Sequence, residues 1–184
     1  MKKEFNIIAN LVEKNSKVLD VGCGDGELMK YINENITKDI RGLEISKSNV
    51  QKCVEKGLTV IEGDAEKDLK QFPLSSFDYV ILSQTLQAFL YPENVISELL
   101  RIGKKAIVTI PNFGYWKVRL HLLFQGTMPI TKNLPNQWYN TPNLHMCTIK
   151  DFVNYCKKKN IKINSTNLNY NNLFSQLGIF VIEK

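Results

Sequence analysis

The chain has 184 residues, 43% of them hydrophobic, and its 24 basic and 18 acidic residues give a net charge of +6. This length and composition predict a single globular domain that buries roughly 70% of its unfolded surface and needs no disulfide or metal to complete its core. The longest apolar runs fall short of the roughly 18 residues of a membrane span, and the lysines are scattered, so we expect neither a membrane protein nor a nucleic-acid-binding one.

We predict an amphipathic helix over residues 4–14 and a buried strand over 17–21. The stretch that follows, residues 18–28, has the sequence V-L-D-V-G-C-G-D-G-E-L, with glycines at every second position from 22 to 26. Helix-forming residues continue to about residue 35. A strand, a tight glycine turn and a helix in this order are typical of a nucleotide-like ligand site in a doubly wound α/β fold.

The glycine turn differs from the fingerprint of dinucleotide sites. That fingerprint is G-x-G-x-x-G, whereas here the third glycine comes one residue early. A pyrophosphate would gain little from Asp20 at the strand end or from Asp25 inside the turn. The two carboxylates suit a ligand whose nearest part is cationic, such as an amino group or a sulfonium. The alternative is an α/β domain whose tight turn binds no ligand.

The second strand is predicted over residues 40–45 and ends in a carboxylate. Glu44 is placed to accept hydrogen bonds from both ribose hydroxyls of a nucleoside, although a surface glutamate at a strand end is the other interpretation. Ser46 is a suitable cap for a helix over residues 47–56. Glu44 therefore extends the predicted ligand site from the first strand to the second.

The third, fourth and fifth strands are predicted over residues 58–61, 77–83 and 105–111, and a helix over 92–101 precedes the last of them. Asp64 follows the third strand, where a carboxylate can accept a hydrogen bond from an adenine amine or cap the next helix, and the two roles are compatible. Strands that alternate with helices predict a parallel sheet.

Residues 112–147 break this alternation. They contain three prolines and the aromatic pair Trp138 and Tyr139. A long irregular segment in a compact domain is usually functional or mobile, so its aromatics wall a substrate pocket, face a partner or pack as a lid on their own sheet.

Regular structure is predicted again near the end of the chain. We expect a helix over residues 149–159 and strands over 161–166 and 177–183, close enough for a hairpin-like connection that makes one of them antiparallel. The prediction is one seven-stranded α/β domain spanning residues 1–184, with an irregular aromatic loop or lid at 112–147.

The cysteines and histidines add two expectations. The four cysteines form no C-x-x-C pair, so we expect reduced thiols, a cytoplasmic protein and no metal site. His121 and His145 are the only histidines. His145 is our candidate for a catalytic base, with loop packing or a partner contact as its alternative roles.

Four features in order resemble class I S-adenosylmethionine-dependent methyltransferases: V-L-D-V-G-C-G-D-G, the strand-two glutamate, G-D-A at 63–65 and F-D-Y-V at 77–80. The resemblance implies a Rossmann-like sheet of seven strands with the last antiparallel, and a site for S-adenosylmethionine or S-adenosylhomocysteine. By resemblance, the methionine part lies against Asp20, Gly22, Cys23 and Gly24, the ribose against Glu44, the adenine against Ile45, Asp64 and Ala65, and the methionine or substrate side near Ser83 and Gln84.

A closer resemblance covers nearly the whole chain. The segments L-D-V-G-C-G-D-G-E-L, S-Q-T-L-Q-A-F, P-N-F-G-Y-W-K-V-R and G-T-M-P-I-T-K-N-L-P-N-Q-W-Y-N-T-P-N-L-H-M-C-T-I-K-D-F are similar to the MetW family of methionine-biosynthesis proteins. The family is linked to homoserine O-acyltransferase, which it supports or activates as a partner. The resemblance does not establish a methyl acceptor.

Two hypotheses follow. In the first, a regulatory protein with a methyltransferase fold senses S-adenosylmethionine or its demethylated product and holds the acyltransferase active through the aromatic loop. In the second, a methyltransferase acts on a small molecule that enters under residues 112–147. We favour the first, because the segment 112–147 is long and rich in aromatic residues and because the sequence offers no convincing base. The tetrapeptides D-P-P-Y and N-P-P-Y used by amino-methylating enzymes are replaced here by S-Q-T-L after strand four.

Overall fold

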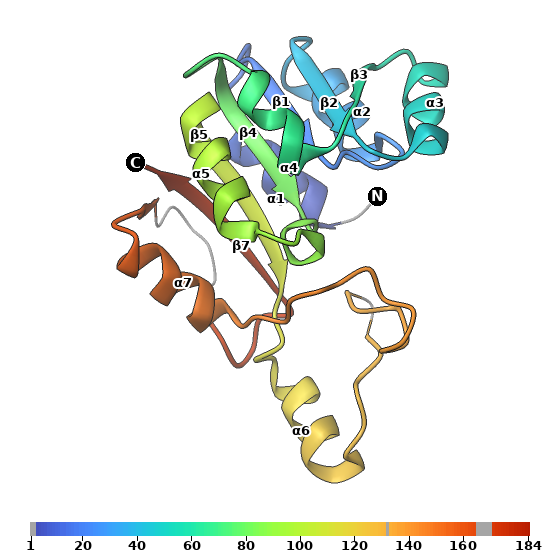
Figure 1. Ribbon diagram of the computed structural model, residues 1–184, viewed down its shortest axis with the longest axis vertical. Coiled ribbons are helices and arrows are strands. Elements are labelled where there is room, and N and C mark those ends of the chain that lie inside the picture. Colours follow the sequence, from blue (N-terminus) through green and yellow to red (C-terminus); the bar gives the residue numbers. More distant parts are fainter. Residues whose placement is uncertain (1–2, 132, 165–170) are drawn as a thin grey trace.

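The computed structural model describes residues 3–131, 133–164 and 171–184, whose centre is a seven-stranded sheet. The strands are β1 (Val18–Val21), β2 (Ile40–Glu44), β3 (Thr59–Glu62), β4 (Phe77–Ser83), β5 (Gly103–Pro111), β6 (Lys162–Asn164) and β7 (Leu177–Glu183). Their order is β3-β2-β1-β4-β5-β7-β6 (Figure 1). β1 to β5 pair in parallel, and β7 is antiparallel to both β5 and β6. The predicted α/β class and antiparallel terminal strands are therefore confirmed, and residues 165–166 of the predicted strand 161–166 lie outside the described residues.

Apart from α6 (Trp116–Gln125), the helices follow the predicted pattern, with small shifts at their ends. They are α1 (Lys3–Leu11), α2 (Glu27–Asn35), α3 (Lys47–Glu55), α4 (Ala65–Asp68), α5 (Pro92–Ile102), α6 (Trp116–Gln125) and α7 (Ile149–Lys158), with short 3₁₀ turns η1 (Leu69–Gln71) and η2 (Leu86–Ala88). Thr148 and Asp151 form a reciprocal capping box at α7. Ser46 occupies the cap position of α3, but its hydroxyl lies 3.0 Å from Ser48 Oγ and makes no cap bond, so that predicted bond is wrong.

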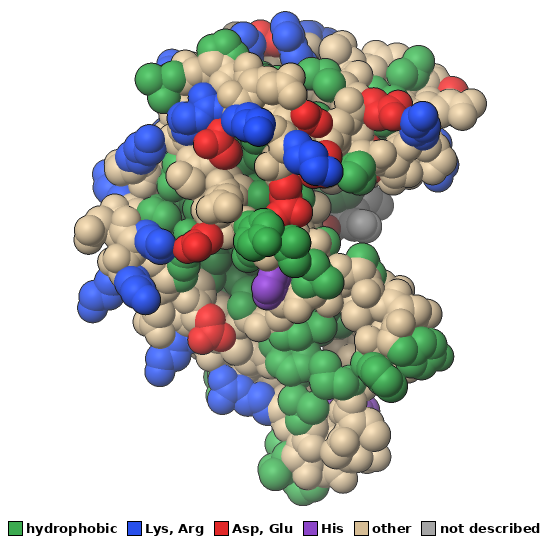
Figure 2. Space-filling model, in the orientation of Figure 1, with side chains coloured by type: hydrophobic (Ala, Val, Ile, Leu, Met, Phe, Trp, Pro, Cys, Tyr) green, Lys and Arg blue, Asp and Glu red, His purple; other side chains and the backbone are tan. Residues whose placement is uncertain are grey.

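Helix α6 lies inside the segment that the sequence predicts as irregular. It projects beyond the carboxyl end of β5, away from the sheet (Figure 1). Val118 is its one buried residue, whereas Leu123 and Phe124 are each 74% exposed. Hydrophobic side chains gather over this projecting part of the surface (Figure 2). Because apolar residues lie on several sides of the helix, it lacks the one-sided periodicity from which a helix is predicted.

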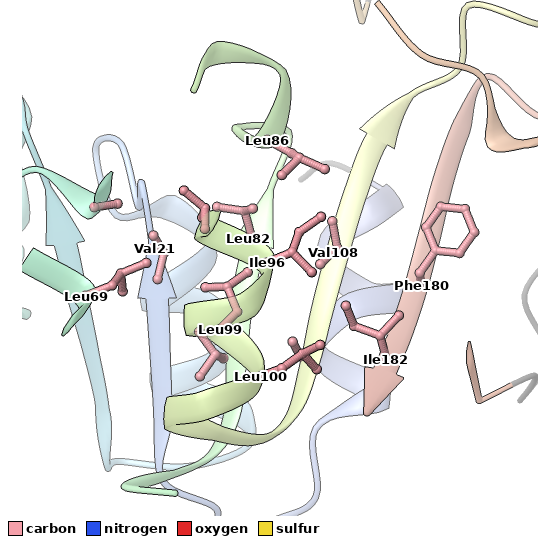
Figure 3. Packing of buried hydrophobic residues seen from close by; sticks show 14 of the residues in the cluster. Val21, Leu69, Leu82, Leu86, Ile96, Leu99, Leu100, Val108, Phe180 and Ile182 are labelled. Carbon is pink, nitrogen blue, oxygen red and sulfur yellow. The ribbon is translucent and has the colours of Figure 1, made fainter. Parts of the chain in front are cut away.

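Helices cover both faces of the sheet, and side chains alternate between the two faces along each strand. Leu19 and Val21 join the cluster that packs against α5 and α7, part of which is shown in Figure 3. Val18 joins the opposite cluster, with α1, α2 and α3. Asp20 lies between Leu19 and Val21 in the strand, so its side chain points to the face covered by α1 and α2. Within the described residues, none of the helices is long and apolar enough to cross a membrane.

Candidate functional site

The glycine turn between β1 and α2 depends on left-handed backbone conformations. Gly24 has φ +58° and Gly26 has φ +80°. A Cβ on Gly26 would lie 2.7 Å from Leu58 Cδ1 and 2.8 Å from Cys53 Sγ, so the turn packs directly on its neighbours there. A Cβ on Gly24 would meet no atom within 4 Å. The turn thus presents bare backbone to open space at residue 24, where a ligand can approach closely.

A cavity of about 940 Å³ opens over this turn. Six of the predicted site residues line it together: Asp20, Gly22, Cys23, Gly24, Ser83 and Gln84. The carboxyl ends of β1 and β4 supply these residues because the two strands are parallel neighbours, Asp20 pairing with Ile81. The position agrees with the general rule that open α/β sheets bind ligands outside the carboxyl ends of their strands.

Asp20 is the chemically unusual residue of this cavity. Its side chain is 1% exposed, and its Oδ1 atom has no hydrogen-bond partner among the described residues. Burial, and secondly the charge of Glu44, raise the pKa of Asp20 to about 8. An unsatisfied buried acceptor is costly unless a ligand supplies a donor. A cationic N–H group of a ligand would satisfy Oδ1, and the residues present therefore fit the amino-acid end of S-adenosylmethionine.

Asp25, the second carboxylate of the turn, has a different environment. It also lines the cavity, but Lys56 Nζ lies 3.4 Å from its Oδ2 atom and donates a 2.7 Å hydrogen bond to its backbone oxygen. The same ammonium forms a 2.6 Å ion pair with Glu27. Lys56 therefore already supplies a cation beside Asp25. Of the two aspartates, Asp20 is the better candidate to contact a cationic ligand.

Glu44 joins the turn to the end of β2. Its carboxylate accepts hydrogen bonds from the backbone N–H groups of Gly24, at 2.9 Å, and Ser46, at 2.8 Å. Each bond uses a different oxygen, Oε2 for Gly24 and Oε1 for Ser46. Since a carboxylate oxygen has two lone pairs, each oxygen retains one for a further donor. The side chain is 7% exposed, and it is not among the residues that line the 940 Å³ cavity.

The residues predicted to contact adenine lie beyond Glu44, outside the lining of the cavity. Ile45 is 67% exposed at the tip of β2. Asp64 accepts a 3.0 Å hydrogen bond from the backbone N–H of Glu66, which confirms its capping role, and Lys67 lies 2.7 Å from its other oxygen. The bond to Lys67 is the main reason that the pKa of Asp64 is lowered. Ala65 is buried at the start of α4.

Cys23 and Gln84 complete the cavity in different ways. Burial raises the pKa of the Cys23 thiol, so the thiol stays protonated and contributes an apolar wall rather than a nucleophile. Gln84 has φ +54°, unusual for a residue with a side chain, and its Nε2 donates a 2.8 Å hydrogen bond to Glu4 Oε1 on α1.

Sequence reasoning missed the contribution of α1 and α2 to the cavity. Lys3, Glu4 and Phe5 on α1 and Tyr31 and Glu34 on α2 line it. The amphipathic pattern of residues 4–14 shows which face of α1 is buried. It gives no signal that the start of this helix reaches the glycine turn.

His145, the predicted catalytic base, is not brought together with the glycine turn. It lines a second, apolar cavity of about 440 Å³, among residues of η2, α5 and α7. Its Nε2 atom lies 3.4 Å from the backbone oxygen of Leu90. The histidine side chain therefore lies in the lining of one cavity, and the six predicted cofactor residues named above lie in the lining of another.

Residues 116–131 and 133–146, which we call the apolar arm, expose large hydrophobic side chains. Trp138 is 73% and Tyr139 69% exposed, and their rings pack edge to face with centroids 5.6 Å apart. The other exposed apolar residues of the arm include Leu120, Leu123, Phe124, Met128, Ile130, Leu144 and Met146. Soluble proteins rarely expose so many large apolar side chains on one segment without a partner for them.

Comparison with known proteins gives a family and a fold. The profile of the family described as "Methionine biosynthesis protein MetW" matches residues 2–182. A curated relative from Rhodopirellula baltica, "Bifunctional methionine biosynthesis protein MetXA/MetW", is 33% identical over 165 residues, which are 85% of this chain and 26% of that protein. The chain thus spans about a quarter of the length of the relative that it matches.

Solved structures share the fold at low sequence identity. An S-adenosylmethionine-dependent methyltransferase from Mesorhizobium loti is 14% identical with a TM-score of 0.73, over 98% of this chain and 97% of that one. One from Archaeoglobus fulgidus is 15% identical with a TM-score of 0.71, over 98% and 91%. The [4+2]-cyclase SpnF is 20% identical with a TM-score of 0.66, over 89% and 58%. A cyclase among these neighbours illustrates that the fold alone does not fix the reaction.

Proposed function

Because this chain belongs to the MetW family of methionine biosynthesis proteins, we propose that it binds S-adenosylmethionine or S-adenosylhomocysteine and supports a partner homoserine O-acyltransferase. The observation that carries the proposal is one molecule with two features: a cavity over the glycine turn with a buried, unpartnered aspartate oxygen, and an apolar arm exposed to solvent. We place this activity in the cytoplasm, where the four free cysteines would stay reduced.

The cofactor part of the proposal assigns a role to each side of the glycine turn. Asp20 accepts a hydrogen bond from the ammonium group of the ligand, and the bare backbone at Gly24 allows the ligand to lie close to the chain. Glu44 accepts from the ribose hydroxyls with the lone pairs that Gly24 and Ser46 leave free. When bound, S-adenosylmethionine supplies a methyl group activated by a sulfonium.

The partner part of the proposal rests on the apolar arm and on the relative from Rhodopirellula baltica. That protein carries MetXA and MetW in its name as a single bifunctional chain, and this chain matches 26% of it. We take this joining of MetXA and MetW in one chain as support for a partnership between the two proteins when they are separate. Exposed Trp138 and Tyr139 are of the residue types that dominate binding energy at protein interfaces.

The alternative function is an S-adenosylmethionine-dependent methyltransferase for a small molecule. The fold and the cofactor cavity suit this function equally well. A methyl acceptor with an O–H or N–H group needs a base near the transferred methyl group. The described residues that line the cofactor cavity include no histidine, and His145 lines the other cavity. This separation keeps His145 away from the cofactor cavity, but carboxylates such as Glu4 and Glu34 line that cavity, so the exposed apolar arm, rather than the lack of a base, favours the regulatory function.

Co-purification with the cognate homoserine O-acyltransferase tests the partner proposal. We expect the wild-type chain to form a complex with it, and the double variant Trp138→Ala with Tyr139→Ala to lose most of that binding. Leu74→Ala is the matched control, because Leu74 is 69% exposed but lies outside the apolar arm. An unchanged complex in the double variant would argue against this surface, and equal loss in both variants would indicate a nonspecific apolar effect.

A further inference from the structure

The cofactor cavity and the apolar cavity share a wall. Residues 83–87 leave the end of β4 between them: Ser83 and Gln84 line the cofactor cavity, whereas Leu86 and Gln87 line the apolar one. A change of backbone position in this short segment therefore alters the lining of both cavities.

On the cofactor side, the segment lies against the glycine turn and α1. A Cβ on Gly22 would lie 2.8 Å from Thr85 Cγ2, so the Thr85 side chain fills the space beside the turn. Gln84 donates its backbone N–H to Thr109 Oγ1 at 2.9 Å and its side-chain N–H to Glu4 at 2.8 Å. Its left-handed φ of +54° is costly for a glutamine, and these contacts maintain it.

On the other side, the segment is tied to the apolar arm through Gln87. Its Nε2 donates a 2.8 Å hydrogen bond back to the backbone oxygen of Gln84. Its own backbone oxygen accepts hydrogen bonds from the N–H groups of Leu144, at 2.8 Å, and His145, at 3.0 Å. Gln87 is 7% exposed, so these bonds are largely shielded from water. Hydrogen bonds in such a buried position are stronger than those at the surface.

From these contacts we infer that cofactor occupancy controls the affinity of the apolar arm for its partner, and that Gln87 transmits the effect. The inference rests on the proposed function and adds its regulation. A ligand that lies against Gly22 and Gln84 contacts the Thr85 and Glu4 side chains that surround Gln84 and maintain its left-handed conformation. If Gln84 leaves its left-handed conformation, its backbone oxygen moves away from the Gln87 side chain that donates to it. Gln87 then moves too, and with it the backbone oxygen that accepts hydrogen bonds from Leu144 and His145. The partner and the ligand therefore bias the same segment.

Coupling between two sites is reciprocal, so it can be measured from either side. We expect the dissociation constant of S-adenosylhomocysteine, measured by calorimetry, to change by about fivefold or more when the acyltransferase is bound, the lower end of typical coupling. The acyltransferase dissociation constant should change by the same factor when S-adenosylhomocysteine is saturating.

The decisive variant is Gln87→Met, which keeps the size of the side chain and removes its donated hydrogen bond. It also removes the buried Oε1 atom that has no partner among the described residues, so the chain should fold. Gln71→Met is the matched control, because Gln71 is exposed and its amide donates a 2.8 Å hydrogen bond to Asp68 on the surface. Coupling should fall below about twofold in Gln87→Met and stay at the wild-type value in Gln71→Met.

The outcomes separate this inference from the function on which it rests. Two binding events without coupling in the wild type would overturn the inference and leave the proposed function standing, as would equal coupling in wild type and Gln87→Met. Failure of the wild-type chain to bind either S-adenosylhomocysteine or the acyltransferase would contradict the proposed function, and the inference with it.

Discussion

Replacing Glu44 with alanine should weaken S-adenosylhomocysteine binding by about 30- to 150-fold. The carboxylate has two free lone pairs on separate oxygens, held in place by the backbone N–H groups of Gly24 and Ser46. Hydrogen bonds to a charged group are worth about 1.5–3 kcal/mol each. Two bonds at one carboxylate are not independent, so we take their combined loss as about 2–3 kcal/mol rather than as the sum of two full bonds, at about 1.4 kcal/mol for each factor of ten.

The same substitution leaves two backbone N–H groups without their acceptor, so its effect on the turn must be separated from its effect on the ribose. Calorimetric titration with S-adenosylhomocysteine and with an analogue that lacks both ribose hydroxyls makes this distinction. Glu44→Ala should weaken the first ligand far more than the second. Glu55→Ala, an exposed carboxylate on α3, should change neither by more than about twofold. If Glu44→Ala weakened both ligands equally, Glu44 would act by shaping the turn, and the ribose assignment would be wrong.

Three further predictions concern the turn and the arm. The folded pKa of Asp20, about 8, exceeds its ordinary 3.8, so the unfolding free energy should fall as the pH rises between these values, and urea titrations of Asp20→Asn should lack that part of the slope. Gly24→Ala and Gly57→Ala both place a side chain at positive φ without a clash and should each cost about 1 kcal/mol of stability, yet calorimetry should show weaker S-adenosylhomocysteine binding for Gly24→Ala alone. Leu123→Ser should leave the unfolding free energy within about 0.5 kcal/mol while weakening the acyltransferase complex in pull-down titrations; a large loss of stability would show that the arm packs on its own domain.

The fold was largely predictable because its strands are short, apolar and separated by clear helix signals. The antiparallel placement of β7 followed from the brief connection at the end of the chain. Helix α6 was not predictable by the same means, since its apolar residues face several directions and only Val118 is buried. A helix that leaves most of its apolar side chains exposed lacks the periodicity that packing within one domain imposes.

Part of the candidate site could be predicted from the sequence, and part could not. The resemblance to methyltransferases placed Asp20, Ser83 and Gln84 near the ligand, and they line one cavity because β1 and β4 are parallel neighbours that end at the same edge of the sheet. The ion pair of Asp25 with Lys56 and the hydrogen bond of Gln84 with Glu4 join residues 31 and 80 positions apart. Such contacts depend on how whole helices pack, which local sequence patterns do not encode.

The most direct test of the proposed function is an assay of the cognate homoserine O-acyltransferase with and without this chain, at a series of S-adenosylmethionine concentrations. The proposed function predicts that adding the chain raises acyltransferase activity, and the inferred coupling through Gln87 predicts that the size of this increase varies with S-adenosylmethionine. Acyltransferase activity that is unaffected by the chain at every S-adenosylmethionine concentration would contradict the proposal.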